Sequence, residues 1–228
     1  MLKLPRNLLH LNPTKILVVA FLFMIVIGGS LLSLPIATHS RESVGFLNGI
    51  FTATSALCVT GLVVVDTSSV WSTFGQIIIL LLIQIGGLGV MTAATLAPMI
   101  IGHRFSLKDR LLMRESLGEE GLSGVVRLTK SVFILTFSFE LLGAILLSFN
   151  FIPMYGVKKG IYFSIFHAIS AFCNAGFDLL SPTSLTEYVG DFTLLAPLMM
   201  LIVIGGLGFS VLLDLKNGIR HLSLHSKL

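Results

Sequence analysis

The sequence predicts an all-α membrane protein made of two copies of one helical unit, in which a span, a short re-entrant helix with a loop, and a second span follow one another. Composition is the first observation: 54% of the 228 residues are apolar and 11% are charged, with a mean hydropathy of +0.96. Soluble domains carry about 25% charged residues, so this composition indicates several membrane crossings. The second observation is an internal repeat, which determines the architecture of a chain.

The repeat is a twelve-residue stretch, written FTATSALCVTGL at 51–62 and FHAISAFCNAGF at 166–177. The two copies lie 115 residues apart and are identical at six positions, including one cysteine and one glycine. The motif IGGLG follows each copy, at 85–89 and at 204–208, with a separation of 119 residues. The two halves therefore align with a shift of only four residues, which indicates a duplicated unit.

The first unit, residues 1–101, contains two long uncharged runs and one short one. The run at 16–35 is a predicted span, because about 20 apolar residues cross a bilayer core. The stretch at 43–57 has only fifteen residues, a length more typical of a segment that re-enters the membrane. The run at 70–101 is the second span, and its IGGLG motif predicts a kink or a close helix contact rather than a pore lining.

A charged segment separates the two units. Residues 102–130 hold ten charged side chains and are expected to form a cytoplasmic linker with an amphipathic helix on the membrane surface. The second unit, residues 131–215, repeats the order of the first, and a basic cytoplasmic tail occupies 216–228. Its span, re-entrant stretch and second span are predicted at 131–151, 161–172 and 192–213.

Basic residues gather on one side of this topology. The N-terminal segment, the linker and the tail carry twelve lysines and arginines, whereas the opposite side carries three: Arg41, Lys158 and Lys159. By the positive-inside rule, both termini are expected in the cytoplasm. Since each unit crosses the membrane an even number of times, the units are expected to share one orientation about an axis along the membrane normal.

The repeated stretch predicts a cation pathway. A helix that stops inside the membrane leaves carbonyls unpaired, which is tolerated where protein buries them or where they line a water-filled cavity. Its carboxyl end carries partial negative charge, and rings of carbonyls replace the hydration shell in potassium filters. Gly61 and Gly176 fit such loops because glycine readily adopts positive φ. Asp66 and Asp178 follow the loops and would concentrate cations at the mouth. The alternative is helix packing through small residues, which the matched recurrence disfavours.

These residues carry a family resemblance. TSALCVTGL and ISAFCNAGF, each between two spans with IGGLG in the second, resemble the filter loops of the Trk/Ktr/HKT potassium transporters, above all the bacterial KtrB-type membrane subunit. The resemblance covers essentially the whole chain and implies four such units around one pore. It implies a potassium-coordinating backbone filter at Val59, Thr60 and Gly61 and at Asn174, Ala175 and Gly176.

The resemblance also implies partners and location. It places the protein in the bacterial inner membrane, in contact with lipid, as a homodimer that docks a cytoplasmic ring of nucleotide-binding RCK domains. Potassium is the implied substrate, with sodium as a coupling or activating ion, and neither a cofactor nor nucleic acid is implied.

Only two of the four units are present, and two loops cannot surround an ion. Either the chain is the first half of a longer protein, which we favour, or several copies complete a ring. The expected function is potassium uptake by a pore-forming subunit, and the alternative is a truncated, non-conducting scaffold or assembly partner of a cation transporter. No enzymatic activity is expected, since His167 and Cys173 lie on a helical face without an accompanying carboxylate.

Glu140 is the one charge inside the span at 131–151. Carboxylates inside a membrane are costly and mark functional sites, so Glu140 could bind sodium or line a path. It could instead form a hydrogen bond between helices or lie near an interface, and the sequence does not identify its partner. The two cysteines are expected to be small buried residues rather than a disulfide or zinc site.

Overall fold

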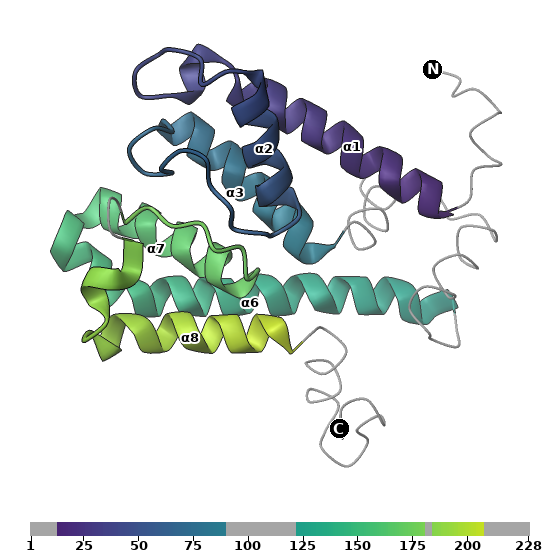
Figure 1. Cartoon of the computed structure of the whole chain (residues 1–228). Helices are drawn as coiled ribbons and strands as arrows, with labels where there is room; N and C mark the ends of the chain where they lie inside the picture. Colours follow the sequence, from purple (N-terminus) through teal and green to yellow (C-terminus); the bar gives the residue numbers. More distant parts are fainter. Residues whose placement is uncertain (1–12, 90–121, 181–183, 208–228) are drawn as a thin grey trace.

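The computed structural model describes residues 13–89, 122–180 and 184–207 (Figure 1). These residues form helices and no strand, apart from one isolated bridge between Thr38 and Trp71. The prediction of an all-α protein is thus confirmed for the described part of the chain. The surface helix expected within the linker falls mainly on residues 102–121, which lie outside the described residues, as does the tail.

The first unit contains one long helix, one short helix and a third helix of intermediate length. They are α1 (Pro13–Leu32), α2 (Phe46–Leu57) and α3 (Thr73–Leu88), with a short 3-10 helix η2 (Pro35–Ala37) after α1. The side chain of Ser72 caps the start of α3 by accepting a hydrogen bond from the Gly75 N–H. Gly89, with φ of 74°, ends α3, and the remainder of the predicted span lies outside the described residues.

The second unit repeats this order. It comprises α6 (Leu122–Tyr155), α7 (Val157–Phe172) and α8 (Phe192–Gly206), with the 3-10 helix η3 (Ser184–Tyr188) before α8. Helix α6 begins inside the segment assigned to the linker and continues without interruption into the predicted span. Asp191 caps α8, and hydrogen bonds from Thr193 and Leu194 hold the pKa of Asp191 below its usual range.

Equivalent helices pack in equivalent ways. Helix α1 packs on α2 and α3 as α6 packs on α7 and α8, and α3 meets α7 where the two units join (Figure 1). A Cβ atom added to Gly28 of α1 would lie 2.8 Å from Leu82 Cδ1, and one added to Gly143 of α6 would lie 2.5 Å from Leu201 Cδ1. Because Gly28 and Gly143 are 115 residues apart, the duplication extends from the sequence to the helix contacts.

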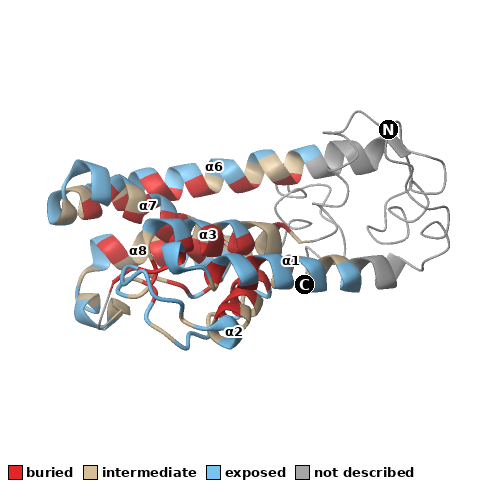
Figure 2. Ribbon diagram, turned by 90° about the horizontal axis from the view of Figure 1, so that it is seen from above, coloured by how far each residue is buried: buried red, intermediate tan, exposed pale blue. Residues whose placement is uncertain are grey.

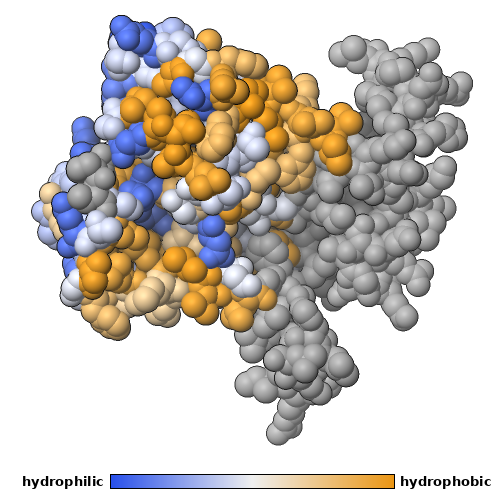
Figure 3. Space-filling model, in the orientation of Figure 1, coloured by the Kyte–Doolittle hydropathy of each residue, from blue (hydrophilic) through white to orange (hydrophobic). Residues whose placement is uncertain are grey.

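The exterior of the helices is apolar. One described helix, Lys130–Tyr155, is long and apolar enough to cross a membrane, and shorter apolar helices accompany it. Buried residues line the inner sides of the helices in Figure 2, whereas the outer sides are exposed. Figure 3 shows hydrophobic residues over much of this outer surface, and hydrophilic ones gather toward the end opposite the undescribed residues. Such an exterior suits surrounding lipid.

Candidate functional site

The two copies of the repeated stretch form a helix that ends in a loop with the same hydrogen bonds. We name residues 58–61 loop 1 and residues 173–176 loop 2. Each helix end is closed by bonds of the Schellman type, which satisfy carbonyls that the helix leaves free. In loop 1 the bonds are Cys58 N to Thr54 O (2.8 Å), Val59 N to Ala56 O (3.2 Å) and Thr60 N to Ser55 O (2.9 Å). In loop 2 they are Cys173 N to Ile169 O (2.9 Å), Asn174 N to Ala171 O (3.0 Å) and Ala175 N to Ser170 O (2.8 Å).

Backbone dihedral angles repeat as well. Val59 and Asn174 have φ of 54° and 57°, and Gly61 and Gly176 have φ of 78° and 73°. A positive φ in a β-branched residue such as Val59 is rare and strained, and it persists only where the surroundings impose it. The alternation departs from a regular strand, in which successive carbonyls point in opposite directions. Each loop thus has an unusual backbone conformation that is repeated in the other loop.

The two loops touch each other through their glycines. A Cβ atom on Gly61 would lie 2.8 Å from the Ala175 carbonyl oxygen and 3.2 Å from Gly176 Cα. One on Gly176 would lie 3.3 Å from Gly61 Cα. Gly61 of loop 1 therefore lies directly against Ala175 and Gly176 of loop 2, and a side chain at Gly61 would overlap the loop 2 backbone.

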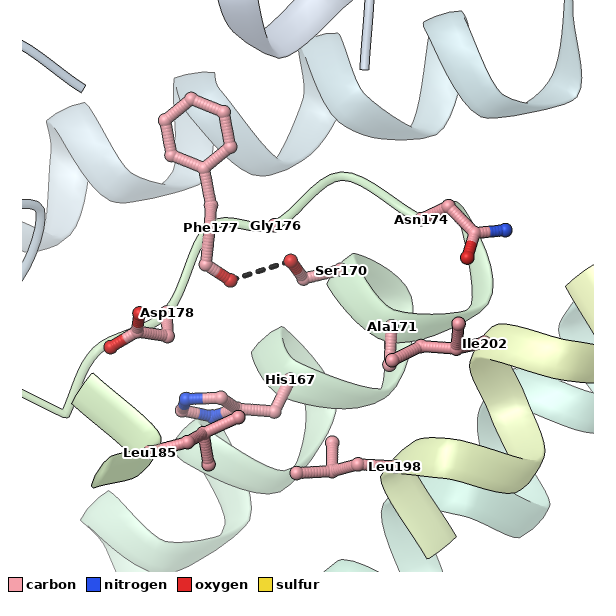
Figure 4. A pocket seen from close by; sticks show the side chains of 10 residues that line it. All are labelled: His167, Ser170, Ala171, Asn174, Gly176, Phe177, Asp178, Leu185, Leu198 and Ile202. Atoms are coloured by element: carbon pink, nitrogen blue, oxygen red, sulfur yellow. Dashed lines mark hydrogen bonds between the residues drawn. The ribbon is translucent and has the colours of Figure 1, made fainter. Parts of the chain in front are cut away.

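The Asn174 side chain turns toward α8 (Figure 4). With the amide oriented so that its nitrogen faces the Ile202 carbonyl, it donates to that oxygen at 3.2 Å and its own oxygen accepts from the Gly206 N–H at 3.2 Å. Because the Asn174 amide is engaged with α8, only the backbone of Asn174 is left to bind a ligand in loop 2.

A buried histidine braces the segment that follows loop 2. His167 Nδ1 donates to the Phe163 carbonyl (2.7 Å), and its Nε2 accepts from the Leu179 N–H (3.2 Å). Ser170 Oγ donates to the Phe177 carbonyl at 2.5 Å, shown by the dashed line in Figure 4. These groups line a cavity of about 320 Å³ between α7, α8 and the loop. The sequence had indicated only that His167 is not catalytic, and its bracing role was missed.

The first unit lacks this bracing. Thr52 and Ser55 occupy the positions equivalent to His167 and Ser170, and their buried hydroxyls have no hydrogen-bond partner among the described residues. Two polar residues spaced three apart lie on one face of both helices, so this spacing does not by itself distinguish the braced helix from the unbraced one.

The two predicted mouth carboxylates lie after the loops, and both shape the chain locally. Asp66 accepts hydrogen bonds from the N–H and the hydroxyl of Ser69, each at 2.6 Å. Asp178 accepts from the Leu180 N–H at 2.8 Å and from the Ser184 hydroxyl at 2.7 Å. Asp66 is exposed and Asp178 is half-buried, so each retains access to solvent.

The first glycine of each IGGLG motif packs against the end of the helix that precedes a loop. A Cβ atom on Gly86 would overlap the carbonyl oxygen of Leu57, the last residue of α2. A Cβ atom on Gly205 would overlap the carbonyl oxygen of Phe172, the last residue of α7. The expectation of close helix packing at this motif is confirmed, because small residues let backbones approach closely.

Glu140 forms a hydrogen bond between helices, one of the alternatives that the sequence left open. Its two carboxylate oxygens accept from Gln84 Nε2 at 2.9 and 3.2 Å. Glu140 is 5% exposed, and no group of three His, Cys, Asp or Glu residues suited to a metal ion occurs in the described part of the chain.

Comparison with known proteins identifies the family of the chain. The TrkH family model, described as Cation transport protein, matches residues 9–224. Ktr system potassium uptake protein B of Bacillus subtilis (strain 168) is 45% identical over 95% of this chain and 48% of its own length. Potassium/sodium uptake protein NtpJ of Enterococcus hirae is 42% identical over 96% of this chain and 49% of its own length. Ktr system potassium uptake protein B of Vibrio alginolyticus is 37% identical over 94% of this chain and 47% of its own length.

These relatives are named as uptake proteins rather than as enzymes, which agrees with the expected lack of enzymatic activity. The chain spans about half the length of the curated relatives that it matches. The family match covers nearly the whole chain, and the apolar exterior fits a membrane protein. The chain belongs to the TrkH family of cation transport proteins.

Proposed function

We propose that this chain supplies two quadrants of a potassium-conducting pore, with ions coordinated by the backbone carbonyls of loops 1 and 2. The observation that carries the proposal is the paired loop geometry, in which Gly61 and Gly176 have the same positive φ and touch each other. The relatives named as potassium uptake proteins support the choice of ion.

The mechanism requires no chemical turnover. Carbonyl oxygens replace the hydration shell of a potassium ion as it passes the loops. The carboxyl ends of α2 and α7 lie directly before the loops, and their partial negative charge favours a cation there. Sodium is a candidate coupling or activating ion.

A complete pore requires two further units, and the surface of α8 supports this. Ile83 of α3, where the second unit packs, is fully buried, whereas its equivalent in α8, Ile202, is 46% exposed. Likewise Gln84 is half-buried and bonded to Glu140, whereas its equivalent, Val203, is 61% exposed. A third unit packed on α8 as the second packs on α3 would cover these side chains.

The topology proposed with this function has both termini in the cytoplasm and the two units in one orientation about the membrane normal. A homodimer and a cytoplasmic nucleotide-binding regulatory ring are the proposed assembly. A non-conducting scaffold or assembly partner remains the second candidate, favoured by the presence of only two loops in the chain.

Cation uptake tests the proposal. The protein encoded by the natural reading frame that contains this chain is expected to restore growth at low potassium concentration in bacteria that lack their own potassium uptake systems. It should also restore their rubidium uptake. A protein that inserts into the membrane at normal levels but supports no flux would contradict transport and favour the scaffold.

Asp178 provides a second test, which concerns the outer mouth. If its charge attracts cations, Asp178→Asn should lower flux about two- to threefold at ~10 mM ionic strength and little at ~150 mM, because the Debye length falls from about 30 to 8 Å. Flux is measured with an impermeant salt setting the ionic strength. Glu42→Gln, which removes an exposed carboxylate from the segment between α1 and α2, is the control. An equal loss of flux at all ionic strengths would mean that Asp178 acts through its hydrogen bonds with Leu180 and Ser184 rather than by attracting cations.

A further inference from the structure

Glu140 occupies a position where the repeat does not require a carboxylate. Gly28 and Gly143 are equivalent in contact as well as in sequence, so the residue that corresponds to Glu140 in α1 is Ile25. Ile25 packs against the apolar core of the first unit. The fold of one unit is therefore compatible with an aliphatic side chain here, and the carboxylate of the second unit needs another explanation.

The contacts of Glu140 join three helices. Gln84 belongs to α3 of the first unit, and its Nε2 lies within hydrogen-bond distance of both carboxylate oxygens. The Cys173 thiol, at the carboxyl end of α7, lies 4.0 Å from Glu140 Oε1 and can donate to it. Gln84 Oε1 has no partner among the described residues, so Glu140 provides the amide of Gln84 with its hydrogen bonds there.

A glycine brings α3 against the same cysteine. A Cβ atom on Gly87 would overlap the side chain of Cys173, so α3 and the start of loop 2 are in direct contact. Gly87 lies one turn after Gln84, and residues three apart share a helix face. The carboxylate thus closes a contact between α3, α6 and the residue that directly precedes Asn174.

The Gln84–Glu140 contact joins the two units next to the start of loop 2. Two side-chain hydrogen bonds between the units occur among the described residues: Gln84 to Glu140, and Tyr162 to Gln76 at 2.9 Å. Tyr162 lies in the first turns of α7, remote in sequence from loop 2, whereas Glu140 contacts the end of that helix. Coordinating groups act only when surrounding residues hold them within about 0.5 Å of the working geometry.

We propose that Glu140 is a positioning residue, which ties α3 of the first unit to the end of α7 and so sets loop 2 against loop 1. The inference rests on the proposed function for its effect on ions, but the tie itself can be tested without transport. In this role the hydrogen-bond acceptor at position 140 matters and its negative charge does not.

The reactivity of Cys173 tests whether Glu140 and Gln84 hold α3 against the end of α7. The chain has two cysteines, so Cys58→Ser leaves Cys173 as the single thiol, and its alkylation by a membrane-permeant maleimide can be timed in native membranes. Glu140→Leu and Gln84→Leu should each raise the rate about tenfold, and the double variant should react no faster than the faster single one, because the residues act as one pair. Glu140→Gln, which keeps an oxygen for Gln84, should stay within about twofold of the parent.

Tyr162→Phe is the matched control, because it removes the other bond between the units and should leave Cys173 protected. Unchanged alkylation in Glu140→Leu and Gln84→Leu would overturn the tie, whether or not the protein transports ions.

Transport separates positioning from direct action on the ion. In the transport-competent protein, Glu140→Leu and Gln84→Leu should lower the ratio of potassium to sodium flux, and Glu140→Gln should retain it. If Glu140→Gln loses selectivity as Glu140→Leu does while Cys173 stays protected, the charge acts on the ion and positioning is wrong. If the parent protein shows no flux, the proposed function fails, and the alkylation rates still decide the tie.

Discussion

Replacing Gly61 with serine should lower the ratio of potassium to sodium flux about tenfold or more. The left-handed conformation costs an L-residue about 1–2 kcal/mol, and a tenfold change in discrimination corresponds to ~1.4 kcal/mol. The new side chain would also meet the Ala175 carbonyl oxygen at 2.8 Å, so that the loops must separate or rotate. Paired rubidium and sodium uptake measurements give the ratio.

Gly45→Ser is the matched control in the same unit. Gly45 has φ of 86°, and a Cβ atom there would meet nothing within 4 Å. It precedes α2 at the opposite end from loop 1, so serine there meets a positive φ without touching the loops. The control should keep selectivity, so a loss shared by both variants would assign the effect to general strain. Unchanged selectivity in Gly61→Ser would contradict the coordinating role of loop 1.

Gly176→Ser should act in the same direction, since Gly176 has the same left-handed φ. Its nearest contact across the loops is longer, 3.3 Å to Gly61 Cα, so backbone strain rather than overlap is the main cause there.

Local backbone features of the loops could be predicted from the sequence because they depend on neighbouring residues. The short stretch at 43–57 was expected to re-enter the membrane, and α2 ends at Leu57, directly before loop 1. The positive φ of Gly61 and Gly176 followed from the residue type alone. The same local logic fails at Val59, where a β-branched residue has a positive φ that its own preferences oppose and the surrounding contacts impose.

Contacts between the units could not be predicted in the same way. Gln84 and Glu140 lie 56 residues apart on different helices, and their meeting depends on how two spans rotate and slide against each other. Periodicity identifies the face of a helix but not its partner. The bracing role of His167 escaped prediction for a related reason, because its partner is the backbone of Leu179, which no sequence pattern distinguishes.

Gly86→Ala should destabilise the protein, because the added methyl group would overlap the Leu57 carbonyl at the end of α2. That oxygen belongs to backbone, so α2 and loop 1 must shift rather than a flexible side chain. Overpacking of this kind costs about 1–3 kcal/mol, and for soluble proteins of 150–250 residues each kcal/mol lowers Tm by roughly 2–4 °C. We therefore expect a Tm about 2–12 °C lower for the purified protein in detergent. Gly205→Ala should have the same effect through Phe172.

Gly190→Ala is the control for these alanine variants, since a Cβ atom at Gly190 would meet nothing within 4 Å. It should keep the parental Tm. A parental Tm in Gly86→Ala would show that α3 does not hold α2 closely, and a loss in Gly86→Ala alone would mean that the two units are supported differently. Since α2 ends at Leu57, directly before loop 1, a shift at Leu57 should also displace loop 1. The same variant is then expected to lose selectivity at temperatures where it remains folded. If both results are found, the first glycine of each IGGLG motif would affect ion selectivity through the position of a helix end rather than by contact with the ion.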